Sequence, residues 1–249
     1  MSTQNDKAPS TEMDVTEDAL MGGRVRLLQP KHGYRVAVDA VLLAAAVDAR
    51  PGEKILDLGA GVGSVGLCLA ARVADCRIVG IELQDALAAL AEQNAALNQL
   101  SDRVRVLRHD LAHPLPGDLG LFEHVAANPP YLPAAVADPS PNPIKALATV
   151  ESSAGLDRWL DVATSMATST VTLIHRSDRL EEIAHGLERR DWTDIAILPL
   201  TPVRRVLVRA RRSAGGQRHE APPFILHRPE GGYTLAAEAV LRHTAPLAF

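Results

Sequence analysis

The residues best suited to chemistry form the tetrapeptide Asn128-Pro129-Pro130-Tyr131, which follows an apolar run over residues 122–127. Two consecutive prolines stop a strand and stiffen the turn that follows it. In such a turn the Asn128 side-chain oxygen and the Pro129 carbonyl can accept the two hydrogens of a planar amino group, so that its delocalised lone pair is directed at an electrophile. Tyr131 offers a flat face on which a base can stack, a contact worth about 1–3 kcal/mol. The tetrapeptide predicts an amine-binding site; a Pro-Pro turn with a structural tyrosine is the plainer interpretation.

A second candidate site is the glycine-rich stretch Asp57-Leu58-Gly59-Ala60-Gly61-Val62-Gly63-Ser64, between a strand-like and a helix-like run. Glycines at alternate positions let the backbone approach a ligand and adopt positive φ. The spacing Gly61-x-Gly63-x-x-Gly66 matches the dinucleotide fingerprint. A dinucleotide is therefore one candidate ligand, and S-adenosylmethionine is the other.

Three acidic residues at or near the ends of successive predicted strands favour S-adenosylmethionine. Parallel strands place ligands at their carboxyl ends. There Asp57 can hold a methionine ammonium directly or indirectly, Glu82 can accept from both ribose hydroxyls, and Asp110 can accept from an adenine amine. A pyrophosphate gains nothing from the charge of Asp57. We therefore expect S-adenosylmethionine as cofactor, held by seven residues: Asp57, Gly59, Ala60, Gly61, Gly63, Glu82 and Asp110.

The elements that must position these residues alternate between strand and helix. Continuously apolar runs predict parallel strands that helices cover on both faces. The link between the last two predicted strands is too short for a parallel crossover, so that pair must be antiparallel. We predict an α/β fold with a Rossmann-like sheet, mostly parallel with an antiparallel final strand. The predicted strands are 54–59, 77–83, 104–110, 122–127, 170–174, 194–200 and 204–210, and the helices are 64–73, 85–97, 156–167 and 177–190.

The two ends of the chain add smaller elements. Two short strands between residues 22 and 39, linked through 31–33, predict a hairpin, and Asp39 is placed to cap a helix over 40–47. A strand at 224–226 and a helix at 236–242 are expected near the other end. We expect a disordered tail over residues 1–20 and one domain over 21–249. That domain divides into the hairpin and helix (22–50), a catalytic core (51–212) and a C-terminal strand and helix (213–249).

Residues 54–131, with the glycine loop and the three acids, resemble the class I S-adenosylmethionine methyltransferases. The tetrapeptide is similar to the motif of amino-group methyltransferases that act on adenine N6 or on glutamine amide nitrogen. This resemblance implies that Asn128, Pro129, Pro130 and Tyr131 are the catalytic residues. Because the motif follows the fourth strand of the cofactor sheet, it would face the methyl donor.

The flanking segments narrow the resemblance. Residues 29–44 and 224–234 resemble those of bacterial tRNA adenine N6-methyltransferases, which modify the purine beside the anticodon of valine tRNA. This implies adenine N6 in tRNA as the substrate. The alternatives are a protein glutamine or rRNA guanine N2-methyltransferase, or a non-catalytic RNA- or dinucleotide-binding module. A glutamine methyltransferase carries a helical substrate domain ahead of the fold, for which we expect no room here.

Charge is unevenly distributed along the chain. The net charge is −4, yet residues 201–249 hold eight arginines against three acids, which leaves −9 for the remainder. The densest basic run, residues 204–212, is either a solvated strand end or a rim that binds phosphates. We expect RNA binding, with strong salt dependence, by six residues: Lys31, Arg35, Arg204, Arg205, Arg211 and Arg212.

Composition excludes several other classes. Cys68 and Cys76 are the only cysteines, which excludes a disulfide scaffold and a Cys-x-x-Cys metal or redox site. The histidines at 109, 113 and 124 lack helical metal-ligand spacing. The chain opens without a signal-peptide pattern and has no apolar run of membrane-spanning length. We therefore expect a cytoplasmic enzyme with no metal and no membrane partner.

Overall fold

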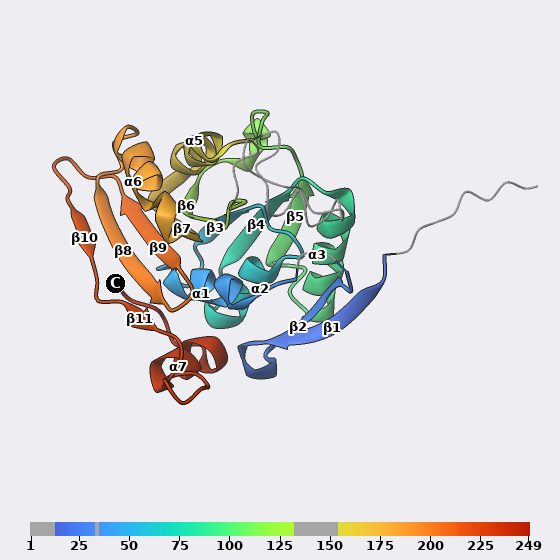
Figure 1. Cartoon of the computed structure of the whole chain (residues 1–249). Helices are drawn as coiled ribbons and strands as arrows, with labels where there is room; N and C mark the ends of the chain where they lie inside the picture. Colours follow the sequence, from blue (N-terminus) through green and yellow to red (C-terminus); the bar gives the residue numbers. More distant parts are fainter. Residues whose placement is uncertain (1–12, 33–34, 132–153) are drawn as a thin grey trace, which may run out of the picture.

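The centre of the molecule is a nine-stranded sheet (Figure 1). The structure, a computed structural model, describes residues 13–32, 35–131 and 154–249. The strands of the sheet follow the order β10-β8-β9-β7-β6-β3-β4-β5, and β11 also pairs with β8. They are β3 (Lys54–Leu58), β4 (Arg77–Glu82), β5 (Val104–Arg108), β6 (Phe122–Ala127), β7 (Ala167–Arg176), β8 (Asp194–Thr201), β9 (Arg205–Arg211), β10 (Arg218–Glu220) and β11 (Phe224–Ile225).

Strand direction in this sheet agrees with the predicted fold class. Only β9 runs antiparallel to its neighbours, β7 and β8, and the remaining pairs of the sheet are parallel. The mostly parallel Rossmann-like sheet with an antiparallel strand is thereby confirmed. One consequence matters for the site: Arg205, which begins β9, lies opposite Arg176, which ends β7. The start of β9 therefore reaches the edge at which the parallel strands end.

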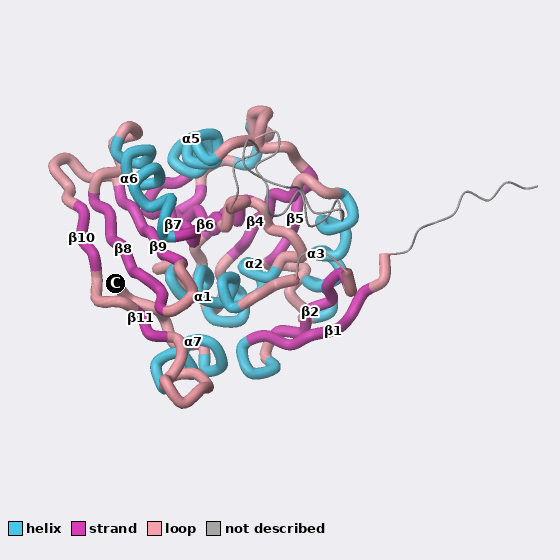
Figure 2. The backbone as a smooth tube through the Cα atoms, in the orientation of Figure 1, coloured by secondary structure: helices cyan, strands magenta, loops and turns pink. Residues whose placement is uncertain are grey.

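Helices cover both faces of the sheet (Figure 2). Neighbouring strand residues point to opposite faces, so Ile55 belongs to one buried apolar cluster and Leu56 to the other. The first cluster includes residues of α1 (Val38–Ala46), α2 (Ser64–Arg72), α3 (Asp85–Leu97) and α7 (Leu235–His243), and the second includes residues of α5 (Leu156–Met166) and α6 (Leu180–Glu188). Short 3₁₀ turns are η1 (Met21–Gly23), η2 (Gly117–Leu119) and η3 (Ser177–Arg179). Among the described residues, no helix is long and apolar enough to cross a membrane.

The N-terminal hairpin is present, but its strands differ from the predicted ones. It pairs β1 (Val15–Leu20) with β2 (Val25–Pro30) through η1. The second predicted strand is wrong for residues 35–39, which form a coil segment and the start of α1, and the tail prediction is wrong for 15–20. Gly22 and Gly23 make this turn at φ of +66° and +90°. In β1 exposed residues alternate with half-buried ones. Because no residue of this strand is fully buried, its composition is polar, and a polar composition is also typical of a disordered tail. Residues 1–12 of the predicted tail lie outside the described residues, as does the segment around residues 132–145, whose prolines predict a loop.

Two asparagines, one in α3 and one at its C-cap, hold the hairpin. Asn94 Oδ1 accepts from the Leu28 N–H (2.7 Å), and its Nδ2 donates to the carbonyls of Leu28 (2.8 Å) and Val62 (2.9 Å). One helical turn later, Asn98 exchanges hydrogen bonds of 2.8 and 2.7 Å with the backbone of Arg26. The amide side chains thus take the place of a third strand beside β2.

Other predicted elements shift at their ends. Asp39 does not cap α1, because Ala37 occupies the N-cap position and Asp39 lies buried in the first turn. The helix predicted over 177–190 begins as η3 and continues as α6. Strand β10 was not predicted, and the predicted strand at 224–226 is the two-residue β11.

Candidate active site

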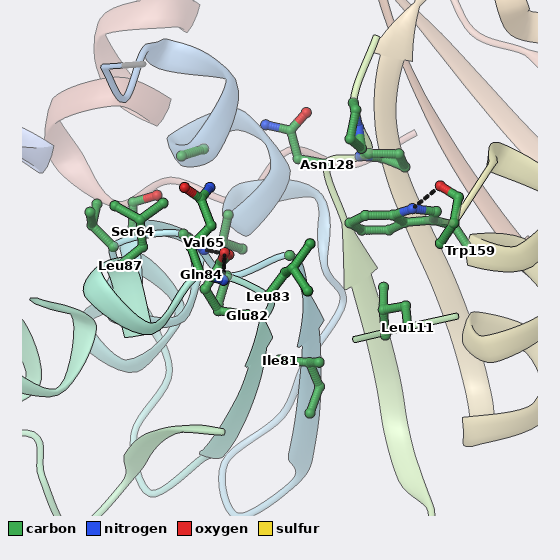
Figure 3. Close-up of a pocket in the computed structure, with 18 of the residues that line it drawn as sticks. Ser64, Val65, Ile81, Glu82, Leu83, Gln84, Leu87, Leu111, Asn128 and Trp159 are labelled. Carbon is green, nitrogen blue, oxygen red and sulfur yellow. Dashed lines mark hydrogen bonds between the residues drawn. The ribbon is translucent and has the colours of Figure 1, made fainter. Parts of the chain in front are cut away.

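A cavity lies where β3, β4, β5 and β6 end. About 1140 Å³ of space, which includes open solvent, lies between its walls. It is open between the glycine loop and β4 on one side and Asn128 and Trp159 on the other (Figure 3). Its lining includes these candidates from the sequence: Gly59, Ala60, Gly61, Glu82, Asp110, Asn128, Pro129, Pro130 and Tyr131. The predicted cofactor loop and the predicted amine-binding turn therefore face one cavity.

The glycine loop is held against β4. The backbone N–H groups of Gly59 and Ala60 both donate to the Ile81 carbonyl, at 2.8 and 2.9 Å. Gly59 has φ of +70°, and a Cβ there would lie 2.5 Å from Cη2 of Trp159. Glycine is thus needed both for the backbone conformation and for the close approach of the indole ring. Trp159 of α5 lines the cavity.

Gly63 serves the loop in another way. It is the N-cap residue of α2, with φ of +83°, and a Cβ there would lie 3.3 Å from Cβ of Ala91. It is not among the residues that line the cavity. In the structure Gly63 packs the loop against α3, and its contact with the cofactor stays a prediction.

Glu82 and Asp110 place two carboxylates in the wall of the cavity. Glu82 accepts backbone hydrogen bonds from Gly61 and Gln84, both at 2.8 Å, and burial raises the pKa of its carboxyl despite these donors. Asp110 Oδ1 accepts from the Ala112 N–H at 2.9 Å. Both carboxylates are thus oriented by the backbone and line the cavity, Glu82 from the end of β4 and Asp110 from the loop after β5. The strand predicted over 104–110 is therefore wrong for its last two residues, because β5 ends at Arg108.

Asp57 lies below the cavity and does not line it. Its side chain is buried within β3, and Oδ2 has no hydrogen-bond partner among the described residues. Burial raises the pKa of Asp57 to about 7, and the nearby charge of Glu82 adds to the rise, whereas a backbone hydrogen bond from Gly66 opposes it. Of the two roles expected for Asp57, direct contact with a ligand is not supported and the indirect, electrostatic one remains.

Tyr131 links the amine-binding turn to two distant elements. Its hydroxyl lies 2.8 Å from Asn128 Oδ1 and 2.9 Å from Asp39 Oδ2 on α1. Arg205 Nε donates to the same Asp39 oxygen at 3.1 Å. The Arg205 guanidinium also lies over the Tyr131 ring, 4.3 Å from its centre, so one face of the ring is covered by a cation. Asp39 was predicted only as a helix cap.

His175 of β7 supports the same turn from below. Its ring meets the Tyr131 ring edge-on at 5.4 Å, and its Nε2 donates to the Pro130 carbonyl at 3.3 Å. Burial lowers the pKa of His175 to about 4, so the ring is neutral near pH 7. No sequence pattern singled out this histidine, because it lies near the end of a buried strand, 45 residues away from Pro130.

The predicted RNA-binding residues separate into distinct places. Arg204 and Arg205 line a groove beside Tyr131, together with Arg176, Asp178 and the 202–203 turn; we call this the arginine groove. Arg211 pairs with Asp48 at 3.2 Å, and Arg212 lies 5.5 Å over the Trp192 ring, both at the far end of β9. Lys31 follows β2, and Arg35 pairs with Asp18 of β1 at 2.6 Å. The structure therefore does not bring the six basic residues into one patch.

Comparisons with known proteins agree with this geometry. The family model of the methyltransferase small domain matches residues 35–139. A tRNA1(Val) (adenine(37)-N6)-methyltransferase from Yersinia enterocolitica is 30% identical over 210 residues, 80% of this chain and 81% of that protein. One from Serratia proteamaculans is 30% identical over 80% of this chain and 79% of its own length.

The fold also has relatives among solved structures. A crystal structure described as "a predicted O-methyltransferase" from Agrobacterium tumefaciens superposes with a TM-score of 0.67 at 23% identity, covering 84% of this chain and 98% of that one. This likeness shows the class I methyltransferase fold. Given the glycine loop, the strand-end carboxylates and relatives that match four fifths of its length at 30% identity, this chain is an S-adenosylmethionine-dependent N-methyltransferase and belongs to the family of the bacterial tRNA1(Val) (adenine(37)-N6)-methyltransferases.

Proposed function

We propose that this enzyme transfers a methyl group from S-adenosylmethionine to N6 of an adenine in tRNA, the base beside the valine tRNA anticodon being the first candidate because the relatives are named for it. One observation carries the proposal. The turn Asn128–Tyr131 and the loop Gly59–Gly61 line the same cavity, so an amine held by the first faces a ligand held by the second.

The cavity residues fit S-adenosylmethionine. Glu82 is placed for the ribose hydroxyls and Asp110 for the adenine amine, while the backbone of Gly59–Gly61 lets the ligand come close. The unpartnered, buried carboxyl oxygen of Asp57 supplies a negative potential below the loop that favours a cationic ligand. When bound, S-adenosylmethionine supplies an electrophilic methyl group.

The enzyme's own task is to position the amine. Asn128 Oδ1 and the Pro129 carbonyl accept its two hydrogens, which leaves the nitrogen lone pair pointing across the cavity. Tyr131 stacks on the base. After transfer the nitrogen loses one proton to water, so the site needs no strong base. Catalysis rests on positioning and on neutral acceptor oxygens.

The arginine groove favours a substrate that carries phosphates. It adjoins Tyr131, and Arg204 is exposed in it. A nucleotide whose base stacks on Tyr131 has its flanking phosphates within reach of this groove, whereas a peptide glutamine makes no use of it. This observation supports RNA over protein as the substrate.

Mass spectrometry of nucleosides from tRNA and rRNA, with and without the gene, tests the proposal. We expect N6-methyladenosine to disappear from tRNA when the gene is deleted and to return with the purified enzyme and S-adenosylmethionine. Loss of N2-methylguanosine from rRNA, or loss of methylglutamine from a protein with unchanged RNA, would assign one of the alternative substrates. Unchanged methylation everywhere would favour a non-catalytic module.

A further inference from the structure

The Tyr131 hydroxyl has one proton and two acceptor oxygens beside it. Asn128 Oδ1 is 2.8 Å away and Asp39 Oδ2 is 2.9 Å away, so only one of them can receive the proton at a time. The choice affects the reaction, because Asn128 Oδ1 is also the oxygen that the proposed function requires for the amine of the substrate.

The charge around Asp39 decides where the proton goes. Hydrogen bonds to a carboxylate are about twice as strong as those to a neutral amide oxygen. Asp39 is 7% exposed and forms an ion pair with Arg205 at 3.1 Å, which keeps its carboxylate in place. The Tyr131 proton therefore goes to Asp39. The phenolic oxygen accepts a side-chain hydrogen bond from Arg205 and keeps its other lone pair for Asn128.

The orientation of the Asn128 amide depends on where the Tyr131 proton goes. Two oxygens at 2.8 Å with no proton between them repel each other, whereas an amide nitrogen in the same place donates to the phenolic oxygen. The two ends of an asparagine amide exchange places by a half-turn about the last side-chain bond. That half-turn points Nδ2 at Tyr131 and directs Oδ1 into the cavity.

We infer that Asp39 is a positioning residue for methyl transfer: by accepting the Tyr131 proton it sets the Asn128 amide with its oxygen toward the amine. Arg205 takes part by holding the Asp39 carboxylate. The inference rests on the proposed function, since it assumes an amine donor at Asn128. It assigns a role in turnover to a helix residue 92 positions away from Tyr131.

The substitution Asp39→Asn tests this directly. It keeps the size of the side chain and removes the charge, so the Tyr131 proton is free to go to Asn128 Oδ1 and the amide then presents its NH₂ group to the amine. We expect kcat for tRNA methylation to fall roughly 10- to 100-fold, the value of one charge-assisted hydrogen bond. The Kd of S-adenosylmethionine should change less than about twofold, since Asp39 does not line the cavity.

A double-mutant cycle with Tyr131→Phe separates positioning from a structural effect. Without the hydroxyl, Asp39 has no route to Asn128, so Asp39→Asn should cost less than about threefold in the Tyr131→Phe background. Equal losses in both backgrounds would overturn the inference. Should Asp39→Asn unfold, Arg205→Gln tests the same link from the other side and should lower kcat in the same way.

Asp48→Asn is the matched control. Asp48 follows α1 and forms an exposed ion pair with Arg211 at the other end of β9, at 3.2 Å. We expect unchanged turnover, because this aspartate lies away from Tyr131. Full activity of Asp39→Asn beside an active wild type would overturn the inference alone. A wild type that binds S-adenosylmethionine and methylates no nucleoside would overturn the proposed function and the inference with it.

Discussion

At the scale of single residues, Asn128 is the side chain whose removal should separate binding from catalysis. It lines the cavity opposite Glu82 and carries the acceptor oxygen proposed for the amine. Asn128→Ala should leave the Kd of S-adenosylmethionine within about twofold of the wild type. Turnover should fall by about 10²- to 10³-fold, as when a positioned polar group is lost from other active sites. Calorimetry and single-turnover methylation of tRNA measure the two quantities, and near-normal turnover would remove Asn128 from the mechanism.

Asp57 leads to a prediction about pH. Because its pKa is raised to about 7 by burial, the carboxyl is partly protonated near neutral pH. A cationic ligand nearby favours the ionised form, so binding lowers this pKa and releases protons. The affinity for S-adenosylmethionine should therefore rise between pH 6 and pH 8, by up to about tenfold if the pKa falls by one unit.

Titration calorimetry at several pH values, in buffers of different ionisation enthalpy, measures both the affinity and the protons released. Asp57→Asn keeps the shape of the side chain and should make the affinity nearly independent of pH. An equally steep pH dependence in that variant would assign the titration to another group, of which Glu82, whose pKa burial also raises, is the first candidate.

The sequence was informative about residues that are contiguous and uninformative about residues that the fold brings together. Asn128, Pro129, Pro130 and Tyr131 stand side by side in the chain, and their chemistry can be predicted from type and spacing alone. Asp39 reaches Tyr131 only because α1 packs beside the end of β6, and an acid before an apolar helix is equally typical of a cap. No rule of local spacing connects the two.

At the scale of elements, the glycine loop shows that glycines in one motif are required for different reasons. Gly59 and Gly61 both have positive φ, but a Cβ at Gly59 would lie 2.5 Å from Trp159, whereas nothing lies within 4 Å of one at Gly61. Gly61→Ala should cost about 1–2 kcal/mol for its backbone conformation. Gly59→Ala carries the same cost and must also displace the indole ring from the cavity wall.

Thermal unfolding and S-adenosylmethionine binding of the two variants test this difference. Gly59→Ala should have the lower Tm and should lose binding by at least about tenfold more than Gly61→Ala. Equal losses would show that the contact with Trp159 relaxes without consequence. Because Trp159 is 100 residues away from Gly59, sequence alone could indicate that both glycines matter but not which one is more sensitive.

The antiparallel strand shows a similar limit. The short link between β8 and β9 was enough to predict their direction, and the structure confirms it. Which end of β9 reaches the active site depends on the place of β9 beside β7, and that pairing is set by the whole sheet. The arginines along β9 therefore looked like one basic run in the sequence.

At the scale of the whole molecule, the arginines of β9 and its flanks lie at two opposite ends of the strands. Its seven residues span about 20 Å, so Arg204 lies in the arginine groove and Arg212 at the opposite edge. Only the first is placed for the phosphates of an RNA whose base stacks on Tyr131. Both side chains are exposed, which makes the two positions a matched pair.

Arg204→Gln should weaken tRNA binding several-fold and lower the slope of log K against log salt by about 1, since it removes one phosphate contact. Arg212→Gln should leave both the affinity and the slope close to the wild type. Fluorescence anisotropy with labelled tRNA over a range of salt concentrations measures the slope. The opposite ranking would move the RNA to the far edge of the sheet.

The asparagine side chains that bond to the backbone of β2 couple the hairpin to the glycine loop. Asn94 bonds at once to Leu28 of the hairpin and to Val62 of the glycine loop, whereas Asn98 reaches the hairpin alone. A bound methyl donor that reduces the motion of the glycine loop should therefore slow deuterium uptake at the Leu28 amide. By thermodynamic reciprocity, a loosened hairpin should lower the affinity for the methyl donor by the same factor. Asn94→Ala should abolish this coupling between the hairpin and the glycine loop, and Asn98→Ala should preserve it. Deuterium exchange at the Leu28 amide of the N-terminal hairpin would then report whether the enzyme has its methyl donor bound.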